Sequence, residues 1–289
     1  MTGEILQYVI SGITIGSIYA LVALGFNFIF NTTDIINFAQ GEFLVFGGLI
    51  MVSLVSFFKL PLIVGFFMTV FLVMVIGVLF ERLTIQPLKD SPIITMIICT
   101  IGVSVLLRGM MMVVWGKASY PLPNFSGENP LRFWGATILP QTLWVIGITL
   151  VLVLLLGLFF KTTLTGKAMR ACAIDKTAAS LMGIKVKQMI MFSFALSAAF
   201  GAIGGIVITP ISLMDFGRGP MLALKGFSAL VLGGLGSPLG AVVAGFLIGV
   251  VEALGAGLIS SGFKDALSLV ILLLVLYIRP SGIFGMREA

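Results

Sequence analysis

Residues 161–189 read KTTLTGKAMRACAIDKTAASLMGIKVKQM, the only long polar segment with helical character in an otherwise strongly apolar chain. The segment carries six basic residues and a single acid, Asp175, and apolar runs flank it on both sides. Lysine and arginine are enriched in the cytoplasmic loops of membrane proteins. Residues 161–189 therefore predict a cytoplasmic loop, and through it the orientation of the apolar segments on either side.

The composition excludes an ordinary soluble protein. Of the 289 residues, 59% are hydrophobic and 10% are charged, whereas a soluble domain carries about 25% charged residues. The chain has no histidine, which removes histidine-based zinc sites, general bases and proton relays, and its two cysteines, Cys99 and Cys172, indicate no disulfide framework. Most of the net charge of +6 lies in the loop 161–189, so membrane orientation explains it and no nucleic-acid partner is predicted. No metal site and no catalytic residue is predicted.

The apolar segments predict an all-α polytopic membrane protein, with one transmembrane domain over residues 1–289. This domain is expected to be a bundle of eight or nine transmembrane helices. A helix needs roughly 20 apolar residues to cross a bilayer. The predicted spans are 5–30, 43–58, 62–80, 93–115, 143–160, 190–209, 221–235, 241–259 and 266–278.

Alternation from the basic loop places the loop 116–141 outside the cytoplasm. It places the C-terminus, with Arg279 and Arg287, in the cytoplasm and the N-terminus outside. Residues 31–58 leave an alternative open, because they could form a discontinuous helix that does not cross twice. A faint likeness between residues 37–50 and 233–249, each a polar break before a glycine-rich apolar run, is too weak to indicate an internal repeat, although transporters often contain one.

The basic loop contains the signals of a short rigid helix. Asp175 is placed to cap a helix over Lys176–Met182, and Gly183 to end it in a left-handed conformation. Two interpretations remain: a loop that only sets topology, or a docking element. A capped helix with an apolar surface favours docking, because a solvated loop needs neither feature.

The block INFAQGEF, residues 36–43, places Asn37, Gln40 and Glu42 between long apolar runs. Such groups persist in a membrane where they line protein or a cavity. We expect Gly41 to permit a break in a helix. The N-terminus of the half-helix after the break carries partial positive charge and can hold an anionic substrate group such as a carboxylate. An ordinary cytoplasmic turn is the competing interpretation.

Two further charges lie within apolar spans. Arg108 is predicted to reach the outer interface with its long side chain. Glu252 is predicted nearer the membrane midplane, where a paired charge on the substrate pathway is the functional interpretation. The glycine-rich run GGLGSPLGAVVAG, residues 233–245, lacks the Lys-Ser or Lys-Thr of a phosphate-binding loop. It is interpreted as close helix packing, so ATP would have to bind to another polypeptide.

Three ordered blocks give the chain a recognisable family pattern. They are GKAMRACAIDKTAASLMGI at 166–184, INFAQGEF at 36–43 and LKGFSALVLGGLGSPLGAVVAGFLIGVVEAL at 224–254, and RPSGIFG at 279–285 agrees with them. Together they resemble the branched-chain amino acid ABC transporter permeases of the LivH type, over essentially the whole chain.

The resemblance implies a permease subunit of an ABC importer for branched-chain amino acids or related small amino acids or amides, in the plasma (inner) membrane of a prokaryote. It implies a homologous LivM-like second permease subunit, two cytoplasmic ATPase subunits that bind the ATP, an extracytoplasmic substrate-binding protein, and no cofactor on this chain. It also implies that the loop helix contacts the ATPase. The coupling residues are then Asp175, Lys176, Ala178, Ala179, Leu181, Met182 and Gly183.

Two other classes of function remain to be weighed. A self-sufficient channel or ion-coupled secondary transporter would use midplane acids, for which Glu42 and Glu252 are the candidates. An intramembrane enzyme is excluded by the lack of HExxH and GxGD motifs and of any histidine to pair with a serine.

Overall fold

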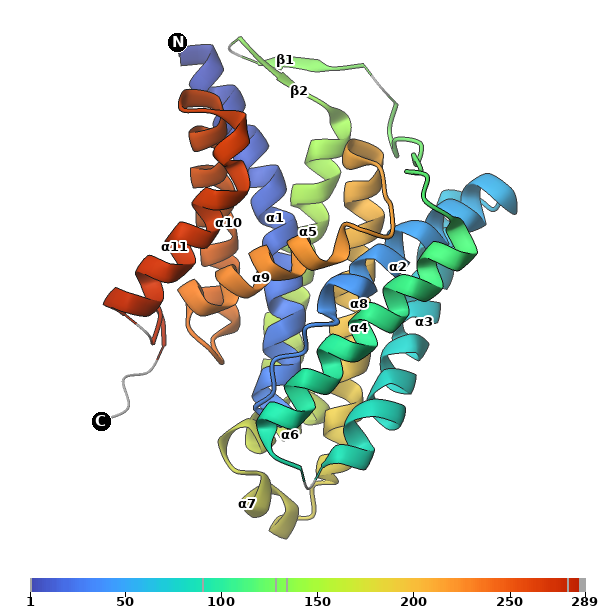
Figure 1. The fold of residues 1–289 in the computed structure, drawn as a ribbon, viewed down its shortest axis with the longest axis vertical. Coiled ribbons are helices and arrows are strands. Elements are labelled where there is room, and N and C mark those ends of the chain that lie inside the picture. The colour runs from blue at the N-terminus through green and yellow to red at the C-terminus, as the bar shows by residue number, and fades with distance from the viewer. Residues whose placement is uncertain (1, 90, 128, 134, 280, 286–289) are drawn as a thin grey trace.

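A computed structural model describes the whole chain except residues 1, 90, 128, 134, 280 and 286–289. Pro280 of the RPSGIFG block and the predicted cytoplasmic Arg287 lie outside the described residues. The protein is a bundle of helices with one small β-ribbon (Figure 1). The helices are α1 (Thr2–Thr33), α2 (Gln40–Val52), α3 (Leu62–Phe80), α4 (Ile93–Trp115), α5 (Pro140–Thr162), α6 (Leu164–Ile174), α7 (Lys176–Leu181), α8 (Val186–Ser212), α9 (Gly219–Gly233), α10 (Pro238–Leu258) and α11 (Lys264–Ile278).

Short π- and 3₁₀-helical turns extend some of these helices: η1 (Ser53–Phe57), η2 (Glu81–Ile85), η3 (Gln86–Leu88) and η4 (Ser261–Phe263). With these extensions, eight helices in the described part of the chain are long and apolar enough to cross a membrane. The ninth apolar helix, α9, has only 15 residues. The prediction of an all-α polytopic protein with eight or nine spans is confirmed.

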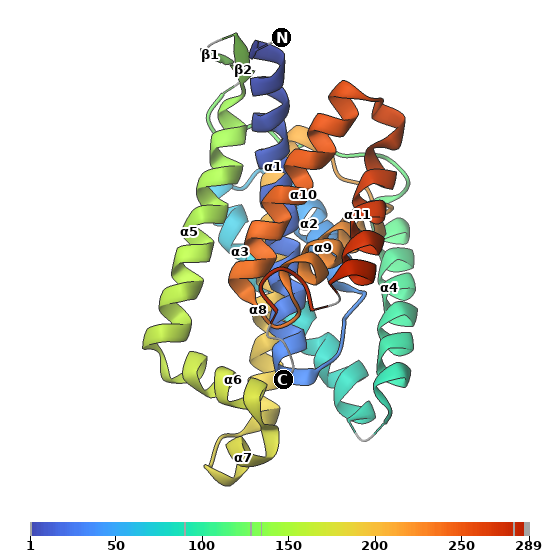
Figure 2. The ribbon, with the colours of Figure 1, turned by 90° about the vertical axis from the view of Figure 1, so that its left-hand side faces the viewer.

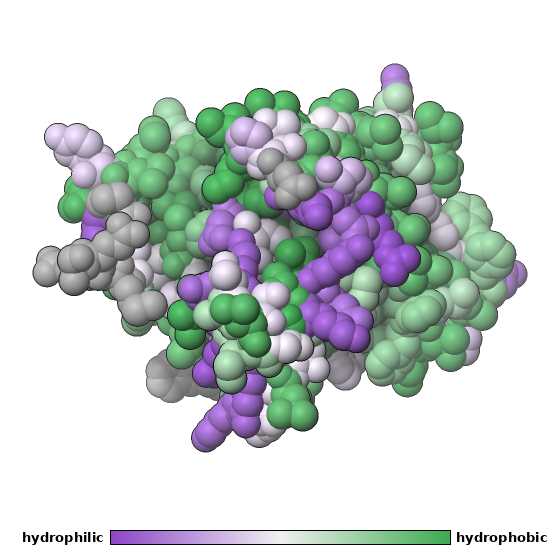
Figure 3. Space-filling model, turned by 90° about the horizontal axis from the view of Figure 1, so that it is seen from below, coloured by the Kyte–Doolittle hydropathy of each residue, from purple (hydrophilic) through white to green (hydrophobic). Residues whose placement is uncertain are grey.

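The two long polar loops lie at opposite ends of the bundle (Figures 1 and 2). One end, here called the α7 end, carries α6 and α7 from the basic loop. The other, called the hairpin end, carries the start of α1 and the antiparallel strands β1 (Leu131–Phe133) and β2 (Ala136–Ile138). Seen from the α7 end, hydrophilic side chains gather near the centre and hydrophobic ones cover most of the rest (Figure 3).

Helix α1 runs through the middle of the bundle, between α5 on one side and α4 and α11 on the other (Figure 2). It packs closely on α10, because glycines on both helices let the backbones touch. A Cβ atom built on Gly249 would lie 2.4 Å from the Cα of Gly16, and one built on Gly16 would lie 2.8 Å from the carbonyl oxygen of Gly245. Glycine contacts of this kind are a common way for helices to associate in membranes.

We expect Gly249→Ala to destabilise the protein by about 1–3 kcal/mol, because the added methyl group forces α10 away from α1. The midpoint of thermal unfolding in detergent measures this. Gly102→Ala on α4 is the matched control, since no described atom lies within 4 Å of a Cβ built on Gly102. Equal midpoints for the two variants would contradict the close packing of α1 and α10.

Helices α2 and α9 both begin inside the bundle rather than at its surface. The segment 34–39 enters from the α7 end, is largely buried, and leads to the start of α2 about halfway along the molecule (Figure 1). The segment 213–218 enters from the hairpin end and leads to α9, which runs obliquely across the bundle. The discontinuous helix expected around residues 31–58 is therefore present.

The two entering segments have the same design. Each follows a long helix, α1 or α8, and each begins with a residue other than glycine in a left-handed conformation: Asp34 with φ of 63° and Leu213 with φ of 51°. The structural counterpart of α2 is thus α9. This pair differs from the faint likeness between residues 37–50 and 233–249, because α9 begins at Gly219.

Candidate functional site

The starts of α2 and α9 meet in the interior of the bundle. A Cβ atom built on Gly41 would lie 2.0 Å from the carbonyl oxygen of Gly219, so no larger residue fits at this contact. Gly41 was expected to permit the helix break, and this role is wrong. The chain breaks earlier, at Asp34, whereas Gly41 lies within α2 and permits the approach of α9.

Glu42 occupies this meeting point and is completely buried. Its Oε1 atom accepts hydrogen bonds from Ser104 Oγ at 2.9 Å and from Arg108 Nη2 at 3.2 Å, both on α4. A Cβ built on Gly219 would lie 2.6 Å from Oε2, so the carboxylate also adjoins the first residue of α9. Because helix N-termini carry partial positive charge, the beginnings of both α2 and α9 favour an anion here.

Arg108 is not an isolated charge, because it has an acidic partner on α2. Its side chain is 32% exposed and forms an ion pair with Glu42. The sequence could not show this pairing, because the two residues lie on helices that meet only through the folding of α2 against α4. Arg108 is therefore one half of an ion pair within the bundle, whereas an unpaired arginine was expected.

Hydrogen-bonding capacity remains unused around Glu42. Glu42 Oε2, Arg108 Nε and Asn37 Nδ2 are buried and have no hydrogen-bond partner among the described residues. Leaving a buried polar atom unpaired costs about 1–3 kcal/mol. Such atoms therefore suit a place where water or a polar solute completes the bonding.

Asn37 and Gln40 have different environments although both are buried. Asn37 Oδ1 accepts from the backbone N–H of Ala39 at 3.1 Å and supports the turn before α2. The amide of Gln40 is occupied by Ser197 on α8, donating to its carbonyl oxygen at 3.1 Å and accepting from its hydroxyl group. Gln40 therefore fastens α2 to α8. The burial of this segment also excludes an ordinary turn exposed at the membrane surface.

Glu252 forms a second buried network, on α10. Its carboxylate accepts hydrogen bonds from Tyr19 on α1 at 3.0 Å, from Lys225 on α9 at 2.9 Å and from Ser268 on α11 at 2.7 Å. Lys225 also forms an ion pair with Asp265 at 2.6 Å. The prediction that Glu252 is a paired internal charge is confirmed, and the network joins four helices.

Lys225 was not singled out from the sequence, although it is the central cation of this network. Its side chain is only 5% exposed. The available signal was a lone lysine in the apolar run MLALKGFSALVLGG, residues 221–234. An ionisable residue within a membrane helix is by default a functional candidate. The Glu42 and Glu252 clusters are separate, and α9 contacts both, through Gly219 and Lys225.

The basic loop folds as two helices, α6 and α7, and the capping pattern is confirmed. Asp175 Oδ1 accepts from the backbone N–H groups of Thr177 at 2.7 Å and Ala178 at 3.0 Å. Gly183 follows α7 with φ of 83°. Leu181 and Met182 are 85% and 84% exposed, which leaves an apolar tip at the extreme end of the molecule (Figure 1).

The seven predicted coupling residues divide by their surroundings. Ala178 is exposed beside the apolar tip, whereas Ala179 is buried and helps to anchor α7. Lys176 Nζ lies 2.5 Å from Asp34 Oδ2, at the entrance of the segment that leads to Glu42. The loop helix is therefore attached to the same chain segment that carries the interior polar residues.

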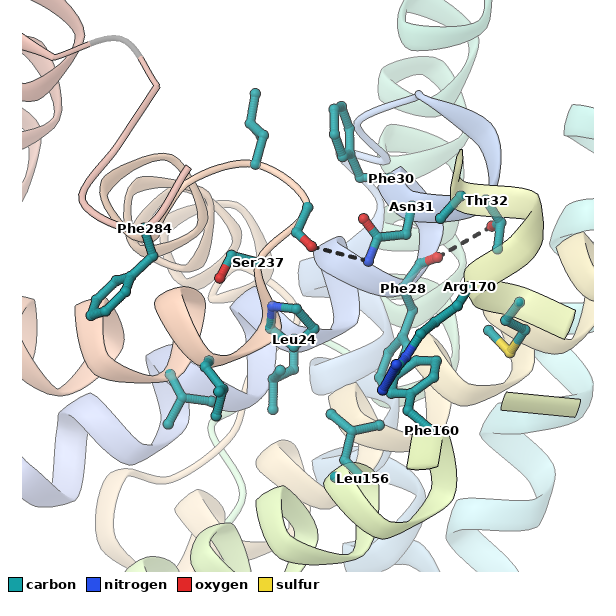
Figure 4. A pocket seen from close by; sticks show the side chains of 18 of the residues that line it. Leu24, Phe28, Phe30, Asn31, Thr32, Leu156, Phe160, Arg170, Ser237 and Phe284 are labelled. Atoms are coloured by element: carbon teal, nitrogen blue, oxygen red, sulfur yellow. Dashed lines mark hydrogen bonds between the residues drawn. The ribbon is translucent and has the colours of Figure 1, made fainter. Parts of the chain in front are cut away.

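Two cavities lie in the bundle, and the smaller one borders the Glu252 cluster. A cavity of about 720 Å³ lies at the α7 end, between α1, α5, α6 and the turn before α10 (Figure 4). A smaller one, of about 300 Å³, is lined by Tyr19, Lys225 and Lys264. No group of three or more residues placed to hold a metal ion occurs in the part of the chain that the structure describes.

Long apolar helices, two helices that start inside the bundle, and buried ion pairs that join each of these two to a long helix are features of a membrane transport protein. The family model "Branched-chain amino acid transport system / permease component" matches residues 8–278. The high-affinity branched-chain amino acid permease proteins LivH of Salmonella typhimurium and BraD of Pseudomonas aeruginosa are 32% and 31% identical, each over 98% of this chain and 96% of its own length. The ribose import permease protein RbsC of Haemophilus influenzae is 27% identical over 90% of this chain and 81% of its own. The chain belongs to the family of branched-chain amino acid transport permease components.

Proposed function

We propose that this chain forms half of the translocation path of an ABC importer for branched-chain amino acids or related small amino acids or amides. A homologous LivM-like subunit forms the other half. Two cytoplasmic ATPase subunits bind and hydrolyse the ATP, and an extracytoplasmic binding protein delivers the solute. The substrate assignment rests on the similarity to LivH and BraD, and the likeness to a ribose permease places the fold in a wider group of importers.

The observation that carries the proposal is the apolar tip of α7. Leu181 and Met182 project from a helix that is capped at both ends and anchored through buried Ala179. A rigid helix with an apolar end suits insertion into a groove of a partner protein. Its attachment through Lys176 to Asp34 offers a route by which movement of the ATPase reaches the segment before α2.

The meeting point of α2 and α9 is the proposed part of the solute path in this chain. The Glu42 carboxylate can attract the ammonium group of a zwitterionic solute, and the Arg108 guanidinium can attract its carboxylate. The unpaired polar atoms of this region can supply hydrogen bonds. Helices that begin within the membrane and present their N-termini to a solute are a recurrent feature of transporters. Glu252, whose carboxylate is fully engaged, then supports the wall of the path.

The proposed orientation puts the α7 end in the cytoplasm of a prokaryotic cell and the hairpin end outside the plasma membrane. The basic residues of the loop 161–189 support it through the distribution of positive charge. The N-terminus then lies outside, the end of α11 faces the cytoplasm, and the loop 116–141 is available to the binding protein.

A self-sufficient ion-coupled transporter is the alternative. Such a mechanism would need a midplane acid free to exchange a proton or ion. Tyr19, Lys225 and Ser268 occupy the Glu252 carboxylate, and Arg108 forms an ion pair with Glu42, so only Glu42 Oε2 keeps a free acceptor for this alternative. Isolation of the chain from native membranes separates the two proposals. Co-isolated ATPase subunits, whose loss abolishes uptake, support the importer, whereas uptake by this chain alone in liposomes would overturn it.

We expect Leu181→Asp to uncouple ATP hydrolysis from uptake, because a charge on the apolar tip opposes docking. Gly183→Val should act similarly, since the left-handed backbone at Gly183 strains any β-branched residue by about 1–2 kcal/mol. Uptake and ATP hydrolysis in reconstituted vesicles measure this, and uptake per ATP should fall at least about tenfold, equivalent to 1.4 kcal/mol.

Leu164→Asp is the control, because Leu164 is equally exposed but lies at the far end of α6 from α7. Normal uptake by the Leu181 and Gly183 variants, at normal abundance in the membrane, would contradict the docking role. The loop 161–189 would then only set the topology of the protein.

A further inference from the structure

The cavity at the α7 end has walls of two kinds (Figure 4). Its inner wall is apolar and belongs to the long helices, with Phe28 of α1, Leu156 of α5 and Val242 of α10. Its polar lining residues are Asn31 and Thr32 at the end of α1, Asp34, Arg170 of α6 and Ser237 before α10. A pocket of this volume is within the usual range for a bound molecule, about 300–1,000 Å³.

Arg170 is the cation of this cavity. It projects from α6 toward Phe160 and Leu156, and its guanidinium carbon lies 5.9 Å from the centroid of the Phe160 ring. The described part of the chain provides no carboxylate within ion-pair distance of Arg170. The other charged group of the lining, Asp34, is already engaged by Lys176. An arginine stacked on a ring, with its donors free, is well suited to bind a phosphate.

The cavity adjoins apolar surface on both flanks. Leu239 of α10 lines it and is mostly exposed, and the same side of α10 continues through exposed Val243 and Leu247. On α5, exposed Leu154 and Leu158 flank the cavity-lining Gly157. Because α5 and α10 are long enough to span a membrane, these apolar strips lie at the depth of lipid chains.

We propose that this cavity binds an anionic phospholipid. Arg170 holds the phosphate at the level of the basic loop, and an acyl chain lies against Phe28, Leu156 and Val242. Basic pockets between membrane helices on the cytoplasmic side are recognised sites for anionic headgroups. The lipid would join α6 to the spans at the point where the loop helix is attached to them.

Native mass spectrometry of the full-length chain, with any co-isolated subunits, tests the proposal in equimolar phosphatidylglycerol and phosphatidylcholine. We expect selective retention of phosphatidylglycerol, weakened about fivefold by Arg170→Ala, as loss of one cation near a charged lipid surface implies. Lys167→Ala is the matched control, because Lys167 is an exposed cation on the same helix that does not line the cavity.

A second pair of variants tests the acyl-chain position. Gly157→Leu should fill the cavity and reduce lipid retention without a backbone clash, because no described atom lies within 4 Å of a Cβ built there. Gly147→Leu is the control, since Gly147 on the same helix is equally open and lies outside the cavity.

Several results would overturn the lipid site. One is equal loss of phosphatidylglycerol in the Arg170 and Lys167 variants, which would indicate general surface charge. Another is unchanged retention in Gly157→Leu. Displacement of the lipid by inorganic phosphate alone would show a headgroup site without a chain, and protection of Arg170 by a second permease subunit would assign the cavity to a protein interface. None of these outcomes depends on which solute is transported.

Discussion

Replacing Glu252 with alanine is expected to lower the free energy of unfolding by about 3–5 kcal/mol, the usual cost of removing one partner of a buried ion pair. The change leaves Lys225 with Asp265 alone and deprives Tyr19 and Ser268 of their acceptor. Equilibrium unfolding in mixed micelles measures the loss. We expect little accumulation of this variant in membranes.

Two further variants distinguish the ion pair from simple loss of volume. Lys225→Leu combined with Glu252→Leu should recover much of the stability, because no unpaired charge then remains inside the bundle. Asp265→Asn removes the other partner of Lys225, but Asp265 is half-exposed, so its cost should stay below about 1 kcal/mol. A double variant less stable than Glu252→Ala would contradict this account.

Glu42→Gln should reduce the initial rate of solute uptake at least about tenfold, equivalent to 1.4 kcal/mol, while the protein still inserts normally. The substitution keeps the volume and one acceptor for Ser104 but removes the charge that holds Arg108 between α2 and α4. Uptake into cells that contain all the proposed subunits provides the measurement, normalised to the amount of permease in the membrane.

The double variant Glu42→Gln/Arg108→Gln decides what the charge does. Recovered uptake would mean that the ion pair only balances charge within the bundle, whereas continued loss would favour a direct role on the solute path. Asn37→Ala, which removes the unpaired Nδ2 donor together with the acceptor for the Ala39 N–H group, should also slow uptake. Normal uptake by all three variants would remove the pathway role from this cluster.

Local patterns in the sequence were sufficient for the secondary structure and for the loop helix. Apolar length gave the spans, and Asp175 and Gly183 gave the limits of α7, because capping depends only on residues within a turn or two. The same reasoning misplaced Gly41, since its role depends on Gly219 in a helix that lies far along the chain.

The buried charges were harder to predict for the same reason. Glu252 was identified as a candidate, but its partner Lys225 lies in the block 224–254, which was used only for the family resemblance, and it was not singled out. Arg108 was assigned to the interface because a helix considered by itself offers it no acid. Both ion pairs involve α2 or α9, the two helices that start inside the bundle. The positions of these helices depend on tertiary packing, which a hydropathy profile cannot predict.

The left-handed residues Asp34 and Leu213 mark the two places where the chain turns into the bundle. Two stretches of one polypeptide, each a long helix, a reversed residue and a shorter helix that starts in the interior, enter the bundle from opposite ends. Glu42 lies eight residues after Asp34, and Met221 lies eight residues after Leu213. Of the two short helices, only α2 therefore carries an acid in its first turn, and the two entrances of the bundle differ in charge although they share a backbone design.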